Sequence, residues 1–183
     1  MILAFMAEGF EEVELLGVVD VLRRAKAEVY TVSVTGERDV TSSHGVTIRA
    51  DMRIEDAPLS GAELLFLPGG MPGTLNLEKN LLLRQALLDQ NDAGRRIAAI
   101  CAAPSVLGHL GILMNKRATC FPGFEGALLG ADYTSKGVVT DRNVTTARGM
   151  GFAVDLGIEL VKLLFGKDKA EEVKIKLQHP DYQ

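Results

Sequence analysis

The sequence predicts an α/β fold with a mostly parallel sheet covered by helices, and three observations support this prediction. Short apolar segments alternate with longer amphipathic ones, as in chains built from β-α-β units. The chain has 183 residues, of which 47% are hydrophobic and 24% are charged, which is ordinary for a globular domain. Neither a repeat nor a low-complexity linker interrupts the alternation. We therefore expect a single domain over residues 1–183.

The first half of the chain predicts three strands, a helix and a hairpin. Residues 1–7 are apolar throughout and predict a buried strand. Residues 11–25 have apolar positions at helical spacing, so they predict an amphipathic helix. The β-branched segment 28–34 predicts a second strand, and weaker alternation over 40–54 predicts a short antiparallel pair. A third buried strand over 64–67 ends at a Pro-Gly-Gly turn.

The second half continues the alternation. Residues 81–93 predict a helix closed by a glycine, and 97–100 predict another buried strand. A helix is expected from about 104 to 110, because the proline at its start suits a first helical turn. The remaining expected elements are two strands joined by a tight turn and two closing helices, over 138–140, 144–147, 152–165 and 167–177.

Charge and cysteine content exclude several classes of protein. The formal net charge is -4 with acidic and basic residues interleaved, so we expect no nucleic-acid partner and no binding to an anionic membrane. No apolar segment is long enough to span a bilayer, and no basic segment precedes the first strand. The two cysteines, Cys101 and Cys120, are too few for a disulfide framework. We therefore expect a cytoplasmic protein.

Cys101 lies between a predicted buried strand and a predicted helix, with alanine at the next two positions. Small neighbours suit a sharp strand-nucleophile-helix turn, because bulky side chains would clash there. The helix N-terminus would stabilise the thiolate and lower the pKa of the Cys101 thiol. The alternative is a small cysteine buried in the core, and the local sequence alone favours neither interpretation.

Glu14 is a second candidate, because the residues three, four and seven positions later are Gly17, Val18 and Val21. A carboxyl group on that apolar face would be desolvated, which raises its pKa and favours the neutral acid. A neutral Glu14 could donate a hydrogen bond to a nearby thiolate. The simpler alternative is an acidic residue that favours the first turn of a helix.

The loop after the third buried strand contains Gly69 and Gly70. Glycines allow close approach of the backbone and expose N–H groups, so this loop could form an oxyanion hole or simply a tight turn. His44 lies on a turn and could reach a site only if that turn folds over the sheet. Metal-ligand spacing and the glycine pattern of a dinucleotide site are both missing from the sequence, so we expect no metal and no cofactor.

Several segments together resemble the DJ-1/ThiJ/PfpI superfamily, and within it the DJ-1 branch. The most specific is Ala98-Ala99-Ile100-Cys101-Ala102-Ala103-Pro104. The others are residues 7–14, 19–25, 67–70 and 146–151, in family order and at family-like spacing. The family fold is a flavodoxin-like three-layer sandwich with a nucleophile elbow, usually found as a homodimer. The resemblance implies the same fold and a homodimer for this chain.

The resemblance also assigns roles to the candidate residues. Cys101 takes the place of the family's nucleophilic and oxidisable cysteine, and Glu14 that of the acid that hydrogen-bonds it. Gly70 and Ala102 correspond to the backbone donors that face the sulfur. Both Cys101 and Glu14 are therefore expected to be functional rather than merely structural.

This chain departs from the family pattern at some positions near the candidate cysteine, and these departures bear on the expected reaction. The peptidase-like branch has a histidine after the cysteine, where this chain has Ala102, and many DJ-1 proteins have a histidine where this chain has Phe121. A Cys/His dyad is therefore not expected, and peptidase activity is disfavoured. His44 stands where relatives often place an arginine, and Gly69 and Arg148 are possible accessory residues.

The function that the resemblance implies is a cysteine-dependent, cofactor-free enzyme of the glyoxalase III or deglycase type. Its substrate would be a small reactive dicarbonyl such as methylglyoxal, attacked by the thiolate of Cys101. The alternative is a non-enzymatic oxidative-stress sensor or chaperone that works through oxidation of Cys101.

Overall fold

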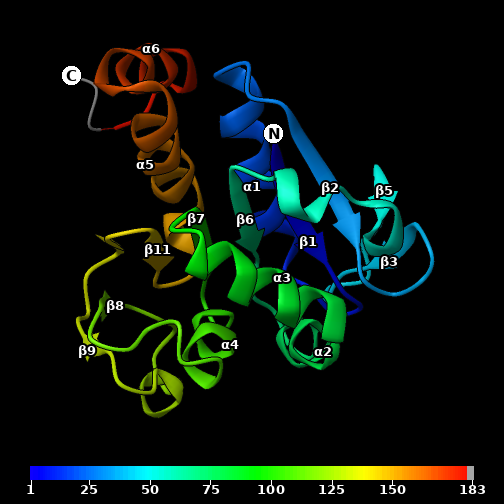
Figure 1. The fold of residues 1–183 in the computed structure, drawn as a ribbon. Coiled ribbons are helices and arrows are strands. Elements are labelled where there is room, and N and C mark those ends of the chain that lie inside the picture. The colour runs from blue at the N-terminus through cyan, green and yellow to red at the C-terminus, as the bar shows by residue number, and fades with distance from the viewer. Residues whose placement is uncertain (181–183) are drawn as a thin grey trace.

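A seven-stranded sheet forms the centre of the computed structural model, which describes residues 1–180 (Figure 1). The expected domain end at residue 183 lies outside the described residues. The strands lie in the order β10-β11-β7-β6-β1-β2-β5, and every neighbouring pair is parallel except β10 and β11. Their bounds are β1 Ile2–Met6, β2 Val29–Ser33, β5 Met52–Arg53, β6 Leu64–Leu67, β7 Arg96–Ile100, β10 Val138–Asp141 and β11 Val144–Ala147.

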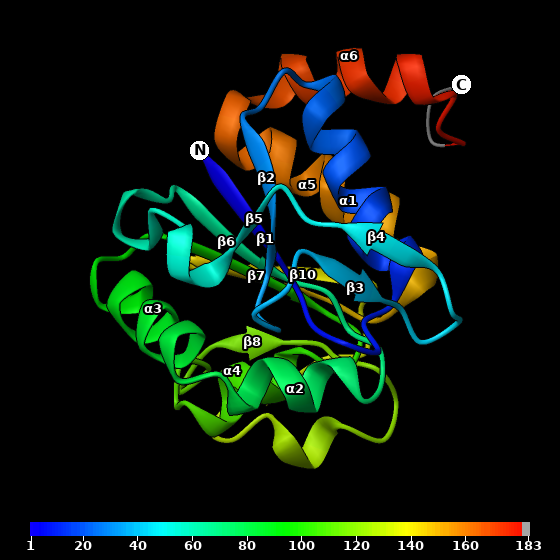
Figure 2. The same ribbon diagram turned by 90° about the vertical axis from the view of Figure 1, so that its right-hand side faces the viewer.

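Helices cover both faces of this sheet and make a three-layer sandwich (Figure 2). One face carries α1 Glu12–Arg24, α5 Ala153–Phe165 and α6 Lys167–Leu177, and the other carries α2 Gly73–Lys79, α3 Leu81–Asp92 and α4 Pro104–His109. Two small two-stranded sheets are added to it: β3 Asp39–Thr41 pairs antiparallel with β4 Thr47–Arg49, and β8 Arg117–Ala118 pairs parallel with β9 Asp132–Tyr133. The predicted α/β sandwich with a mostly parallel sheet is confirmed.

The alternation of side chains along β1 divides the core into two clusters. Ile2, Ala4 and Met6 face the cluster beneath α1 and α5, whereas Leu3 and Phe5 face the cluster beneath α2, α3 and α4. Successive residues of a strand point to opposite faces, so an apolar residue at every position is needed when both faces are covered. This is why an uninterrupted apolar segment predicts a central strand.

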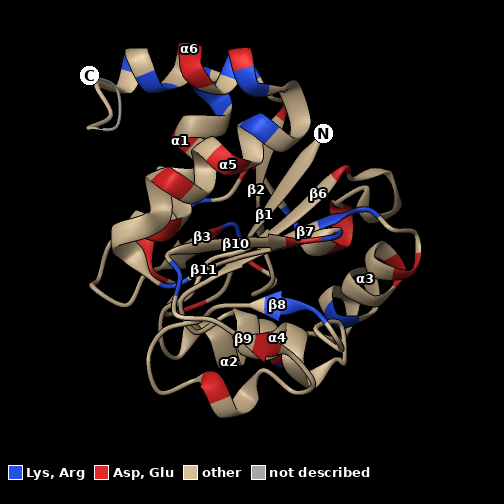
Figure 3. Ribbon diagram, turned by 90° about the vertical axis from the view of Figure 1, so that its left-hand side faces the viewer, with Lys and Arg blue, Asp and Glu red and all other residues tan. Residues whose placement is uncertain are grey.

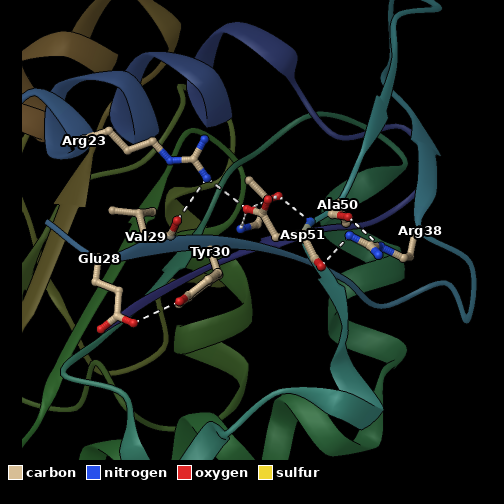
Figure 4. Close-up of polar contacts among 8 residues, drawn as sticks. Arg23, Glu28, Val29, Tyr30, Arg38, Ala50 and Asp51 are labelled. Carbon is tan, nitrogen blue, oxygen red and sulfur yellow. Dashed lines mark hydrogen bonds and ion pairs between the residues drawn. The ribbon is translucent and has the colours of Figure 1, made fainter.

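A polar network fastens the C-terminal end of α1 to the edge of the sheet (Figure 4). The guanidinium of Arg23 donates to Asp51 Oδ2 at 2.9 Å, and the backbone N–H of Thr31 in β2 donates to the same oxygen at 2.8 Å. The side chain of Arg38 donates to the carbonyl oxygen of Ala50 at 2.8 Å. These contacts tie α1, β2 and the segment before β5 together at one edge of the sheet.

Helix α2 and the β8–β9 pair were not predicted. Helix α2 begins with Gly73-Thr74 directly after a proline, so its sequence is typical of a loop, and it spans only residues 73–79.

Charged residues are interleaved over the outer helices, as the sequence predicts (Figure 3). Within residues 1–180, no helix combines the length and apolar character that a membrane span requires.

Candidate active site

The candidate residues meet at the carboxyl ends of β1, β6 and β7. In chain order, the main parallel strands β1, β2, β6, β7 and β11 take the spatial order 2-1-3-4-5, which is the flavodoxin-like arrangement. The strand order reverses between β1 and β6, and ligands of open α/β sheets bind at such switch points. The loop after β6 and the turn after β7 both open at this place.

Cys101 occupies a sharp turn between β7 and α4. Its backbone has φ 64°, a left-handed conformation that is uncommon for a residue with a side chain. Two hydrogen bonds hold this turn: its N–H donates to Ala147 O in β11 at 2.9 Å, and its carbonyl oxygen accepts from Phe121 N–H at 2.8 Å. Strained backbone fixed from both sides is typical of functional positions. The side chain is partly exposed, so the predicted nucleophile elbow presents an accessible sulfur.

Glu14 is fully buried in the first turns of α1. Its Oε2 accepts a hydrogen bond from Gly69 N–H at 2.8 Å, which ties the helix to the loop after β6. Its Oε1 has no hydrogen-bond partner among the described residues. The N–H of Glu14 donates to Glu11 Oε2 at 2.6 Å, so the side chain that caps the helix is that of Glu11. The carboxyl group of Glu14 is therefore not used as a helix cap.

Gly69 separates Cys101 from Glu14. A Cβ atom at residue 69 would lie 2.7 Å from Cys101 Cβ and 2.7 Å from Glu14 Oε2, so only glycine lets the two side chains approach each other. Gly70 has φ 89°, and a Cβ there would collide with the backbone of residues 9–11. The backbone N–H groups of Ala102 and Gly70 face the Cys101 thiol closely enough to lower its pKa in part. The structure thus brings together Cys101, Glu14, Gly69, Gly70 and Ala102.

Burial and mutual charge shift the pKa values of this pair. Desolvation raises the pKa of Glu14 to about 7, although the N–H of Gly69 and the thiol of Cys101 act in the opposite direction. Desolvation, followed by the negative charge of Glu14, raises the pKa of Cys101 to about 12, although the N–H groups of Ala102 and Gly70 lower it in part. The expectation of a lowered thiol pKa is therefore wrong for Cys101 beside an ionised Glu14.

The two groups are better described as one unit that shares a proton. Between pH values of about 7 and about 12 the Glu14–Cys101 pair carries one negative charge. That charge resides on Glu14 with a protonated thiol, or on sulfur with a protonated Glu14. The N–H of Gly69 stabilises the first form, and the N–H groups of Gly70 and Ala102 stabilise the second. Transfer of the proton between the two side chains would interconvert these two forms.

His44 does not join this group. Its side chain is 68% exposed, and its Nδ1 lies 3.2 Å from Glu12 Oε2. Within the described residues, Glu11, Glu12 and His44 bring one ligand atom each to within 4.8 Å of one another. Because Glu11 Oε2 already accepts from the N–H of Glu14, this grouping is explained by helix capping and an ion pair. Arg148 instead lines a groove together with Phe121.

The backbone contacts of Ala147 and Phe121 with Cys101 were not predicted. They come from strands and loops that are distant in sequence, and sequence patterns carry no register between them. The sequence resemblance offered one signal, because its segment 146–151 begins at the end of β11, the strand beside the one that precedes Cys101.

The chain is similar to known proteins over most of its length. The family model of the DJ-1/PfpI family matches residues 1–163. The chain is 38% identical over 92% of its length to protein DJ-1 homolog B of Arabidopsis thaliana, and it spans 39% of that relative and 44% of homolog A. It is 30% identical over 89% of its length to a protein named a deglycase from Pyrococcus abyssi, of which it covers 98%.

Solved structures lead to the same family. Oxidized DJ-1 of Toxoplasma gondii superimposes with a TM-score of 0.94 at 30% identity, over 98% of each chain. The similarity in fold and in sequence thus extends over nearly the whole chain. The chain therefore belongs to the DJ-1/PfpI family.

Proposed function

We propose that this protein is a cysteine-dependent, cofactor-free enzyme that converts small 2-oxoaldehydes such as methylglyoxal into 2-hydroxy acids. The observation that carries this proposal is the Cys101–Glu14 pair, which shares one proton at a glycine-lined, partly accessible turn. A relative named a deglycase, 30% identical over 89% of this chain, supports chemistry on sugar-derived carbonyls. Removal of carbonyl adducts from glycated molecules is a variant of the same chemistry.

The first step would be addition of the thiolate to the aldehyde. The Cys101 sulfur forms a bond to C1 of the substrate, and the C1–O π electrons move to oxygen. The N–H groups of Gly70 and Ala102, which stabilise the charge on sulfur, would then stabilise the charge on that oxygen. Protonated Glu14 supplies the proton that yields a neutral hemithioacetal, and it becomes the carboxylate.

The second step would be an internal transfer of hydrogen. The Glu14 carboxylate removes the proton on C1, which gives an enediol, and returns it to C2, while the hydroxyl proton of C1 moves to the oxygen of C2. C1 is thereby oxidised to a thioester and C2 is reduced to an alcohol, so neither an external oxidant nor a reductant is needed. Water then cleaves the thioester, which releases lactate from methylglyoxal and restores the thiol.

The test is formation of lactate from methylglyoxal by the purified protein, without glutathione or added metal. We expect lactate in proportion to enzyme, with a rate that rises as the pH increases through about 7, because the pair then loses its first proton. Absence of lactate under these conditions would contradict the proposal.

A second candidate function, an oxidative-stress sensor or chaperone, is favoured by the different exposure of the two cysteines. Cys101 is partly exposed, whereas Cys120 is fully buried in the core beneath α2, α3 and α4. We expect mild hydrogen peroxide to add two oxygens to Cys101 first, each peroxide transferring one oxygen and leaving as water. Intact mass and peptide mapping would show the site, and preferential oxidation of Cys120 would count against this function.

The same proposal includes a homodimer and a reducing, cytoplasmic environment. Val13 and Leu16 of α1 are large apolar side chains that are 49% and 43% exposed, which supports a partner surface on that helix. A free thiol at the site is most easily maintained where cellular thiols stay reduced.

A further inference from the structure

An apolar groove of about 390 Å³ opens between the two segments of chain that follow the backbone hydrogen bonds of Cys101 with Phe121 and Ala147. It is lined by Phe121 and Pro122 on one side and by Arg148, Gly149, Met150, Gly151 and Phe152 on the other. Its volume lies within the range of small-molecule sites. Three large apolar side chains remain exposed along it, with Phe121 at 47%, Met150 at 52% and Phe152 at 38%.

Both walls of the groove are fastened to the backbone of Cys101. The first wall begins at Phe121, whose N–H donates to Cys101 O at 2.8 Å. The second begins directly after Ala147, whose carbonyl oxygen accepts from Cys101 N–H at 2.9 Å. The groove therefore adjoins Cys101 in the fold, and the rest of a substrate bonded to the sulfur would extend toward it.

The two rings of the groove rest on glycines. A Cβ atom at Gly149 would lie 3.2 Å from Cδ2 of Phe121, and a Cβ at Gly137 would collide with the ring of Phe152. Each ring thus packs against a backbone position that carries no side chain. This packing holds the rings in place although their outer surfaces are exposed, so the groove is formed before a ligand arrives.

The groove combines apolar rings with one cation. The guanidinium of Arg148, at the start of the second wall, can stack on an aromatic ring, and the sulfur of Met150 also makes favourable contacts with aromatic rings. The methyl group of methylglyoxal would leave most of the groove empty. A flat aromatic group would fill it and would remove the exposed surface of Phe121, Met150 and Phe152 from water.

We propose that the groove binds the aromatic group of aryl 2-oxoaldehydes while their aldehyde carbon reacts with Cys101, with Phe121 as the specificity-determining residue. This inference rests on the proposed function, because it names the substrate class for the same thiol. Phenylglyoxal would accordingly be converted to mandelate more efficiently than methylglyoxal is converted to lactate.

The first experiment compares kcat/KM for phenylglyoxal and for methylglyoxal in wild type and Phe121→Ala. We expect the ratio of the two values to fall about tenfold in Phe121→Ala, and by less in Phe121→Leu, which keeps apolar volume but loses the ring. Phe165→Ala is the matched control, because Phe165 is 43% exposed at the end of α5 and outside the groove. A ratio that stays the same in Phe121→Ala would overturn the proposal.

The second experiment needs no turnover, so it separates this proposal from the proposed function. Calorimetry with phenylglyoxylate and pyruvate, which have no aldehyde to react, should show tighter binding of phenylglyoxylate and about tenfold weaker binding of it in Phe121→Ala. That result without turnover of either aldehyde would refute the catalytic function and keep the aryl site. Equal affinities of wild type and Phe121→Ala for phenylglyoxylate would overturn the aryl site. Conversion of a wild-type dimer to a monomer in Phe121→Ala would also overturn it, because the groove would then be an interface between two copies of the chain.

Discussion

Replacing Cys101 with serine lowers kcat/KM for methylglyoxal at least about a thousandfold, if the thiol is the nucleophile. A serine hydroxyl is far less acidic than a thiol, and the candidate site offers only Glu14 as a base. The residues beside the sulfur, Ala102 and Phe121, supply no imidazole. The alkoxide of serine would therefore be too scarce to add to the aldehyde. Lactate formation by wild type and Cys101→Ser at equal protein concentration measures this effect.

The control is the other cysteine. Cys120 is fully buried in the apolar cluster on the opposite face of the sheet from Glu14, so Cys120→Ala should keep most of the activity while removing a thiol. Far-UV circular dichroism and Tm of both variants show that the fold is retained. Substantial lactate formation by Cys101→Ser, or equal losses in both variants, would show that Cys101 is not the nucleophile.

The sequence predicts the fold well where one pattern decides the structure. The expected strand 64–67 and helix 167–177 agree with Leu64–Leu67 and Lys167–Leu177 to the residue, because apolar content and a glycine mark their ends. Helix α2 was missed because glycine and proline surround its start, and its stability comes instead from Leu77 packing in the core. Local propensity predicts a loop there, and tertiary packing overrides it.

The candidate site could be predicted in part for the same reason. Glu14 is recognisable from its apolar helical face, and Cys101 from its small neighbours. The direction of the thiol pKa could not be predicted, because it depends on a contact between α1 and the turn after β7. The helix N-terminus suggests a lowered pKa, but burial and the charge of Glu14 raise the pKa of Cys101 to about 12. The position of His44 could not be predicted either, because its turn places the side chain beside Glu12 and not at Cys101.

Replacing Glu14 with glutamine is expected to stabilise the protein while it stops catalysis. The pKa of Glu14 is about 7 in the folded protein and near its ordinary value of 4.5 when unfolded. A raised carboxyl pKa contributes stability that is fully present below pH 4.5 and is lost as the pH rises through about 7. Above that pH, the wild type has an ionised carboxylate in a fully buried position, where desolvation disfavours the charge.

The glutamine variant removes this cost because its amide is neutral at every pH. The gap between 4.5 and about 7 corresponds to about 3 kcal/mol in the free energy of unfolding at pH 8.5, or a Tm higher by about 5–10 °C. The difference should shrink at pH 5, where Glu14 is largely protonated in the native state. Thermal unfolding of both proteins at the two pH values measures it. A glutamine variant that is less stable at pH 8.5 would show that the carboxylate is not a cost to the fold.

Reactivity and turnover of Glu14→Gln should change in opposite directions. Loss of the Glu14 charge lowers the pKa of Cys101, so alkylation of Cys101 by iodoacetamide at pH 8 should be faster than in wild type. Lactate formation should nevertheless fall about a hundredfold or more, because an amide cannot carry the proton from C1 to C2. If Glu14 affected only the acidity of the Cys101 thiol, Glu14→Gln would turn over faster than wild type as well as being alkylated faster. Faster alkylation with slower turnover therefore assigns Glu14 to proton transfer, and unchanged turnover would remove it from the mechanism.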